Sequence, residues 1–476
     1  MHDKNHITLI AAAVLSTCSI STVYATNGML MEGYGPESTA MGGTSMAYDN
    51  GTAAMVNNPA ILSRMKEGES RFDLSLGVLQ PDVTASAPVS PTEKATADSG
   101  GDSYLMPAMG WVTHDGQLTY GFGVFSQGGM GTEFDANSSL RGARSEVGVG
   151  AFLMPFAVNV NDKLSIGATG QYVWGGMDLI MGMPLLGPDG APAPGTFFDF
   201  MPGQQNAMGT ATGSLVDGLG QQLGPALEDP NKPLVGQSAI FNFSNDNDFS
   251  GEASGAGISA RLGFAYQASS DFSIGGAYQA KTAMSDWDGK GTMSIVDATG
   301  AVVNNMNIPG TFTVKDFQFP STLSLGMAYN MDKWLFAADI SQIYWSSVMK
   351  DFKLNFAVDP SVPGFGGAAT DITMKQEWDD QTVLKLGAAY ALNDQLTLRG
   401  GLNLANNPVP DKYLNPLFPA IIENHVTMGA TWKFSDAHSI GGSLAIAPEV
   451  EQTNSQTQVE ATHAQNNLQI MYSYRY

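Results

Sequence analysis

The sequence has 476 residues, only 14% of them charged, and a formal net charge of −23. Soluble domains average about 25% charged residues, so this composition is unusual for a soluble enzyme. The acidic balance excludes the basic surface that nucleic-acid-binding proteins need. After the first 25 residues, no stretch reaches the roughly 18 consecutive apolar residues of a membrane-spanning helix. Strands that are apolar on one side and polar on the other would average to this composition.

Residues 1–25 have the features of a secretory signal. Lys4 precedes the apolar stretch ITLIAAAVLST, and the small-residue pattern VYA ends at Ala25. We therefore expect the mature chain to begin at Thr26. Cys18 is the one cysteine of the sequence and lies inside the signal. The mature chain then has no thiol for a disulfide, a metal site or a nucleophile.

Residues 26–69 do not alternate between apolar and polar side chains. The stretch MGGTSMAYDNGTAAMVNNPAIL predicts short helical or irregular pieces separated by glycine and proline. Pro59 follows Asn58 inside apolar surroundings and should end a helix, because proline lacks an N–H and clashes with the preceding turn. One interpretation of Asn58-Pro59-Ala60 is a plain surface turn.

From residue 70 to the end, alternating strands recur. In KLSIGATGQYVW, residues 164, 166, 168, 172 and 174 form an apolar face, and residues 165, 167, 169 and 171 form the other face. A period of two predicts β-strands with one face toward lipid or a core. The strands are joined alternately by short polar turns and by long connections. The long ones cover residues 81–103, 128–147, 176–252, 285–317, 346–380, 406–422 and 448–466.

This alternation gives fourteen strands with six short turns at one end and seven long loops at the other. An even strand number with this asymmetry is typical of outer-membrane barrels, whereas a β-sandwich or propeller is the soluble alternative. Tryptophans near both strand ends (111, 334 and 432 by short turns; 174, 345 and 378 by long loops) and the alternating end NLQIMYSYRY favour the membrane barrel. We therefore predict an all-β, 14-stranded antiparallel transmembrane β-barrel over residues 70–476, preceded by residues 26–69. A barrel of this width has a lumen that such a segment can plug.

The stretch GPESTAMGGTSMAYDNGTAAMVNNPAIL resembles the start of the outer-membrane long-chain fatty-acid transporter family (FadL/TodX type). The resemblance continues through most of the predicted barrel, outside the long loops. It implies that residues 26–69 are an N-terminal hatch that plugs the barrel. Asn58, Pro59 and Ala60 would then be a hatch element, bent at Pro59 and held to the wall by Asn58. It also implies loop capture, an internal pocket and lateral release at a kinked third strand.

The third strand ends in GVFSQGGMG, and this stretch matches the expected gate position, at Gln127, Gly128 and Gly129. Glycine weakens strand pairing there and permits a kink. Apolar stretches in the 176–252 and 406–422 loops would either capture ligand or pack together as a lid. If the apolar strand faces point to lipid, several charged side chains point into the lumen: Arg261, Lys385, Arg399, Arg475 and Asp339.

These charges allow two interpretations. The cations could bind a ligand carboxylate, or they could form a structural network in which Asp339 pairs with one of them, because buried charges are normally paired. We expect uptake of hydrophobic compounds, first of all long-chain fatty acids. Uncharged aromatic hydrocarbons, a general porin and a surface adhesin remain alternatives.

The remaining expectations concern partners and location. No set of serine, histidine and carboxylate predicts an enzyme, although an outer-membrane lipase or protease is the catalytic rival. The acidic stretches NDND and DWDG lack the spacing of a complete calcium loop, and we expect no metal or cofactor. The expected partners are the hydrophobic ligand, outer-membrane lipid and lipopolysaccharide. The protein is expected to be a monomer in the outer membrane.

Overall fold

The computed structural model describes residues 27–476, with the exception of residues 91–92, 136–139, 141, 188, 202–207, 230, 246 and 248–249. The expected signal segment and its cleavage site lie outside the described residues. So does part of the NDND stretch.

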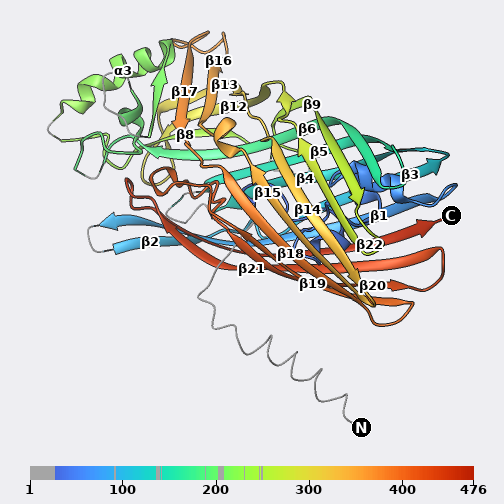
Figure 1. The fold of residues 1–476 in the computed structure, drawn as a ribbon. Helices are drawn as coiled ribbons and strands as arrows, with labels where there is room; N and C mark the ends of the chain where they lie inside the picture. Colours follow the sequence, from blue (N-terminus) through green and yellow to red (C-terminus); the bar gives the residue numbers. More distant parts are fainter. Residues whose placement is uncertain are drawn as a thin grey trace.

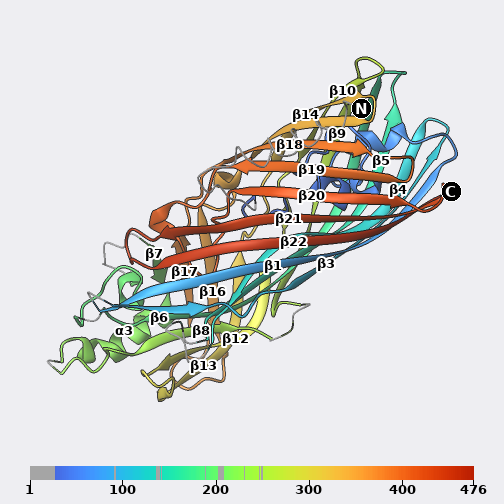
Figure 2. The same ribbon diagram turned by 90° about the horizontal axis from the view of Figure 1, so that it is seen from below.

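Most of the chain forms one closed antiparallel β-barrel (Figures 1 and 2). Each strand pairs with the next and β22 pairs with β1, in the order β1 (Ser70–Ser90), β3 (Tyr104–Asp115), β4 (Leu118–Glu133), β5 (Arg144–Asn159), β6 (Leu164–Pro184), β9 (Ala253–Gln267), β10 (Phe272–Gln279), β14 (Thr322–Met331), β15 (Trp334–Ile343), β18 (Gln381–Ala391), β19 (Leu396–Ala405), β20 (Asn424–Lys433), β21 (His438–Thr453) and β22 (Glu460–Arg475). Each strand that the sequence predicted has its counterpart in this ring.

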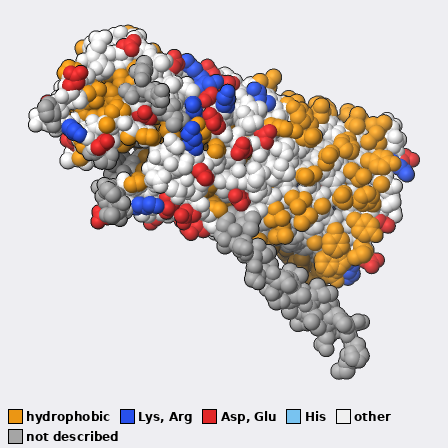
Figure 3. Space-filling view, turned by 60° about the vertical axis from the view of Figure 1, so that its left-hand side comes forward, with side chains coloured by type: hydrophobic (Ala, Val, Ile, Leu, Met, Phe, Trp, Pro, Cys, Tyr) orange, Lys and Arg blue, Asp and Glu red, His pale blue; other side chains and the backbone are white. Residues whose placement is uncertain are grey.

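The two faces of the wall follow the predicted alternation. On β6, Ile166 and Tyr172 are 46% and 51% exposed, whereas the side chain of Thr169 between them is buried. Apolar side chains cover the outside of the barrel toward its short-turn end, and charged side chains gather toward the other end (Figure 3). This outer surface suits a hydrocarbon environment. The inner face combines polar side chains such as Thr169 with apolar ones such as Leu153.

The long connections contain regular secondary structure. They contain further strands, β2 (Glu93–Asp98), β7 (Gly209–Thr212), β8 (Ser238–Phe243), β11 (Ala283–Met284), β12 (Trp287–Val296), β13 (Val302–Lys315), β16 (Asp351–Val358) and β17 (Ala369–Lys375), and the helices η3 (Phe197–Phe200), α3 (Ser214–Leu227), η4 (Trp345–Ser347) and η5 (Asp411–Tyr413). The sheet therefore has 22 strands among the described residues, more than the fourteen expected, because strands of the ring extend into these connections and pair with additional ones. Within the described part of the chain, no helix has the length and apolarity to cross a bilayer.

The apolar stretches of these connections pack against each other. Phe312 of β13 stacks on Phe356 of β16 with 4.4 Å between ring centroids, and Phe243 lies 5.0 Å from Phe312. The apolar residues of the 176–252 and 406–422 loops that were candidates for an exposed capture surface are largely buried, among them Leu185, Phe198 and Leu417. The structure therefore agrees with the compact-lid alternative.

Two tryptophans depart from the expected positions. Trp345 and Trp378 are 0% and 2% exposed, with ring centroids 5.2 Å apart. They belong to the interior of the long-loop end rather than to a lipid-facing girdle. Both lie outside the strands, Trp345 in η4 and Trp378 between β17 and β18, so the alternation of a strand does not set the direction of their side chains.

Residues 27–69, called the N-terminal segment below, lie inside the barrel beside the inner wall (Figure 1). The segment contains α2 (Pro36–Thr39), η1 (Gly51–Met55) and η2 (Pro59–Arg64). Pro59 was expected to end a helix, but it begins η2. Its missing N–H costs nothing at a first helical position, and its fixed φ suits that position.

Candidate functional site

The N-terminal segment approaches the inner wall closely at several wall glycines. At Gly263, for example, an added Cβ would overlap the side-chain oxygen of Asn58. Such close approach of two backbones is a recognised use of glycine in strands. The same holds for several other wall glycines that face the segment: Gly110, Gly123, Gly167, Gly275, Gly326, Gly387, Gly401 and Gly429.

Asn58, Pro59 and Ala60 lie at one of these contacts. Asn58 Nδ2 donates to the carbonyl of Met46 (2.7 Å) and to the carbonyl of Phe264 on β9 (2.9 Å). Its Oδ1 accepts from Ala60 N (3.2 Å) and so caps η2. One buried amide therefore fixes the turn, holds it to another part of the segment and attaches it to the wall.

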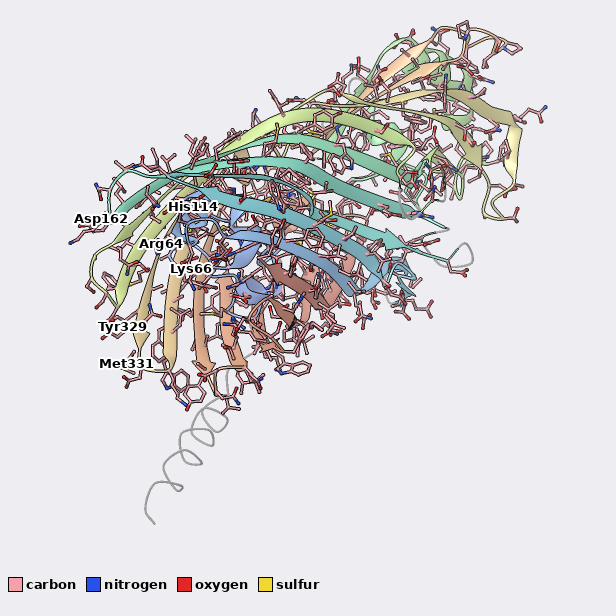
Figure 4. All side chains as sticks on the ribbon, turned by 90° about the vertical axis from the view of Figure 1, so that its right-hand side faces the viewer. Arg64, Lys66, His114, Asp162, Tyr329 and Met331 are labelled. Atoms are coloured by element: carbon pink, nitrogen blue, oxygen red, sulfur yellow. The ribbon has the colours of Figure 1, made fainter. Side chains whose placement is uncertain are left out.

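The segment reaches the short-turn end of the barrel at its last residues. Gly68 N donates to the carbonyl of His114 (3.0 Å), and Arg64 Nη1 donates to the carbonyl of Ala47 (3.2 Å). Figure 4 shows Arg64, Lys66 and His114 near this end, whereas Tyr329 and Met331 belong to the outer wall. The segment is thus attached at both its middle and its end.

The predicted lumenal charges contact the segment. Arg399 forms an ion pair with Glu37 (3.1 Å) and donates to Thr431 Oγ1 (2.7 Å). Asp339 accepts hydrogen bonds from the backbone N–H groups of Ser45 (2.7 Å) and Met46 (3.2 Å). Among the described residues, no lumenal cation forms an ion pair with Asp339 within 4 Å. Lys385, which lies opposite Asp339 in the β15–β18 ladder, donates to the carbonyl of Glu32.

Two other cations hold main-chain carbonyls. Arg261 Nη1 donates to the carbonyl of Asn57 and Lys385 Nζ donates to that of Glu32, at 2.9 and 3.1 Å. Both side chains line a small cavity of about 80 Å³ inside the barrel. The four predicted charges of the preceding paragraphs thus surround the segment from different strands.

The fifth predicted charge lies elsewhere. Arg475, near the end of β22, acts electrostatically on Asp49 and Glu69. These two carboxylates pair directly with Arg71 on β1, at 2.7 and 2.5 Å. The sequence did not predict the role of Arg71. Arg71 lies at the start of a strand, where a charged residue is usually solvated.

The predicted gate residues form an irregularity in β4. The ladder between β4 and β5 shifts register between Ser126 and Gly128, so that Gln127 is an extra, bulged residue. The bulge contacts the N-terminal segment: Gly128 forms a bridge with Leu30, and Tyr34 Oη donates to the carbonyl of Gln127 (2.6 Å). A side chain at Gly128 would overlap the carbonyl of Met29.

The wall beside this bulge is open. The β3–β4 ladder runs only from Ala108–Phe125 to Asp115–Leu118, so residues 104–107 of β3 have no β4 partner. Beyond Ser126, β4 pairs with β5 on its other side. The gap ends at the long-loop side, where Gly100 N donates to the carbonyl of Glu133 (2.7 Å). We call this gap between residues 104–107 and 128–132 the wall opening.

A larger cavity of about 570 Å³ lies behind the wall opening. Its lining extends from the fully buried Glu32 of the N-terminal segment to Leu105 of β3, which is 51% exposed. The lining thus connects the interior with the outer face. Tyr104 and Gly131 line it from opposite edges of the opening, and a Cβ at Gly131 would meet the Tyr104 hydroxyl at 2.5 Å.

The lining of the large cavity combines apolar side chains with several acidic ones. Its apolar lining comes from Met29, Leu30, Met31, Leu79, Leu105, Met106, Met130 and Val147. Its acidic residues are Glu32, Asp102, Glu133 and Glu146, whereas Arg144 is its cation and already pairs with Glu146 (2.9 Å) and Glu133 (3.8 Å). Within the described residues, no group of His, Cys, Asp and Glu side chains is arranged to hold a metal ion.

Comparison with known proteins identifies the family. The family model for outer membrane protein transport proteins (OMPP1/FadL/TodX) matches residues 12–474. The chain belongs to this family. FadL/TodX proteins are transport channels of the outer membrane, so the enzyme alternative is excluded.

Solved structures agree with this assignment. The Pseudomonas putida toluene transporter TodX is 27% identical, with a TM-score of 0.76 over 94% of this chain and 99% of that one. The Ralstonia pickettii toluene transporter TbuX is 30% identical, with a TM-score of 0.71 over the same shares. Alkane uptake protein A of Marinobacter nauticus is 29% identical over 118 residues, 24% of each chain. The curated relatives are matched over only 36% and 24% of their length.

Proposed function

We propose that this FadL/TodX protein takes up uncharged hydrophobic compounds and releases them sideways through the wall opening. The observation that carries the proposal is the large cavity, which extends from buried Glu32 to half-exposed Leu105 through an unpaired part of the wall. Leaving an apolar site for water costs about 25 cal/mol per Å² of apolar surface. An exit toward lipid avoids this cost, whereas a water-filled porin pore does not.

The arrangement of charge favours an uncharged ligand over a fatty acid. Arg399 pairs with Glu37, whereas Arg261 and Lys385 donate to carbonyls of the N-terminal segment. The small cavity beside Arg261 and Lys385 has a volume of only about 80 Å³. A carboxylate in the large cavity would face several acids and a cation that is already paired. The two toluene transporters of similar structure point to the same class of substrate.

The N-terminal segment acts as the hatch in this proposal. Asn58-Pro59-Ala60 anchors it to β9, and residues 28–34 contact the bulge at Gln127–Gly129. A shift of these residues would change the large cavity and the inner side of the wall opening together. We further propose that the protein works as a monomer, since the opening and both cavities lie within one chain.

The test places a bulky side chain on the exposed face of β5, opposite Gly129 and one strand beyond the opening. Gly148 of β5 lines the large cavity, and an added Cβ there meets no atom within 4 Å. Gly148→Phe should therefore fold normally and lower the uptake of labelled toluene by cells about tenfold. Gly170→Phe on β6 is the matched control, because its Cβ meets only the end of Met154, at 4.0 Å.

Three outcomes would contradict the proposal. Unchanged toluene uptake by Gly148→Phe would show that the wall opening is not the exit. Uptake of labelled palmitate with no uptake of toluene by the unmodified protein would restore the fatty-acid alternative. If the protein takes up neither toluene nor palmitate, the porin and adhesin alternatives would be favoured.

A further inference from the structure

Glu32 is a buried acid without an ion-pair partner within 4 Å among the described residues. Its side chain is 0% exposed and lines both the small and the large cavity. Asn467 Nδ2 donates to Oε2 (3.1 Å), whereas Oε1 has no hydrogen-bond partner among the described residues. A buried polar atom without a partner costs free energy, so an unused oxygen beside a cavity requires an explanation.

Glu32 continues a row of polar side chains on β22. His463, Gln465 and Asn467 alternate along the strand, are at most 7% exposed, and line the large cavity. Gln465 Nε2 donates to Asn467 Oδ1 (2.7 Å). His463 Nδ1 lies 2.8 Å from the carbonyl of Pro419, and a carbonyl only accepts, so Nδ1 is the donor. The four residues form one polar side of the large cavity, and we call them the polar floor.

The charges around the polar floor disfavour ionic ligands. An anion would meet Glu32 and Glu146, and Arg144 is already held by Glu146 and Glu133. A cation would meet Lys385, whose Nζ is 3.1 Å from the Glu32 carbonyl. Burial also raises the pKa of Glu32, because desolvation disfavours the charged carboxylate.

We propose that the polar floor binds the hydroxyl group of a neutral, largely apolar compound, a phenol or an alcohol, whose apolar part extends toward the wall opening. This inference rests on the proposed function and defines its substrate class. A hydroxyl group both donates and accepts, so it matches Glu32 Oε1 in either protonation state. Leu79, Leu105 and Met106 provide the apolar surface for the rest of the ligand.

A matched series of ligands tests this assignment. Toluene, p-cresol and p-toluate share one ring and methyl group and differ by a hydrogen, a hydroxyl or a carboxylate. At pH 7.5 the phenol is neutral, because its pKa is about 10, and the carboxylate is charged. Binding to the detergent-solubilised full-length mature protein is measured by calorimetry. The unmodified protein should bind p-cresol about tenfold more tightly than toluene, and p-toluate at least about tenfold more weakly.

Two variants at Glu32 separate hydrogen bonding from charge. In Glu32→Met, the Kd for p-cresol should come to within about twofold of the Kd for toluene, while the Kd for toluene stays unchanged. Glu32→Gln keeps an acceptor and removes the charge, so it should lower the ratio of p-toluate to toluene Kd at least about fivefold. Glu460→Gln is the control, because Glu460 pairs with the exposed Lys94 at the long-loop end and does not line the cavity.

Each outcome gives a decision. If the unmodified protein binds toluene without preferring p-cresol, this inference fails and the proposed function stands; if it binds none of the three, the proposed function itself fails. Unchanged ligand ratios in both Glu32 variants would also overturn the inference. If Glu32→Met does not fold, the p-toluate ratio of Glu32→Gln decides. Tightest binding of 4-methylbenzylammonium would identify a cation site instead and contradict the assignment.

Discussion

The two ends of the barrel interior are filled in different ways. Around the N-terminal segment, wall glycines bring two backbones together, and hydrogen bonds and ion pairs hold them. At the long-loop end, the interior is filled by large apolar side chains such as Phe312, Phe356 and Trp345. Close backbone contacts tolerate little added volume, whereas apolar packing is sensitive to lost volume. The two ends should therefore respond to opposite kinds of substitution.

The largest effect is expected from lost volume at the long-loop end. Phe312→Ala should destabilise this end by about 3–5 kcal/mol, since Phe312 is fully buried between Phe243 and Phe356. Hydrogen exchange should increase in β12, β13 and β16 and stay unchanged in residues 36–64. The control is Phe434→Ala, because Phe434 is 42% exposed. Faster exchange throughout the barrel would show that the two ends are not separate.

A smaller effect is expected from added volume beside the segment. Gly263→Ala should cost about 1–3 kcal/mol of unfolding free energy, because the new Cβ overlaps Asn58 Oδ1. Limited proteolysis should then cleave residues 36–64 faster while β12 and β13 remain protected. Gly170→Ala is the matched control, with free space at its Cβ. Equal proteolysis of the two variants would contradict close backbone packing at Asn58.

The smallest effect is expected from the ion pair between segment and wall. Arg399→Ala should cost about 1–2 kcal/mol, because it leaves the largely buried Glu37 without its cation. Glu37→Ala should cost a similar amount, and the double variant should cost less than the sum of the two. Thermal unfolding of the four proteins measures this coupling. The affinity for toluene should not change; loss of fatty-acid binding in Arg399→Ala would instead identify a carboxylate site.

The sequence predicted the wall well, because the alternation of side chains directly reflects which face is buried. Ile166 and Tyr172 are exposed outside and Thr169 is buried inside, as the pattern indicated. The bulge at Gln127–Gly129 was also predictable, since paired glycines weaken a ladder. The open edge of β3 was not, because an unpaired stretch of strand keeps the same alternation as a paired one.

The partners of the lumenal charges could not be predicted. Asp339 was expected to pair with a cation. It lies opposite Lys385 in the β15–β18 ladder, but its hydrogen bonds come from the backbone N–H groups of Ser45 and Met46, and a sequence does not show which backbone groups will donate to a side chain. Glu32 was overlooked for a related reason. It is the one charge in NGMLMEGYGP, and such a residue is usually solvent-exposed. Its isolation among small and apolar residues was the available signal.

The hydrogen bonds from Arg261 and Lys385 to main-chain carbonyls have an evolutionary consequence. Every amino acid supplies the carbonyl that Asn57 and Glu32 offer to these cations. Mutations in the segment can therefore accumulate without compensating changes at positions 261 and 385. Among diverging homologues, we expect these two cations to persist beside segments of changing sequence. The contacts between the N-terminal segment and the wall would then produce few correlated substitutions.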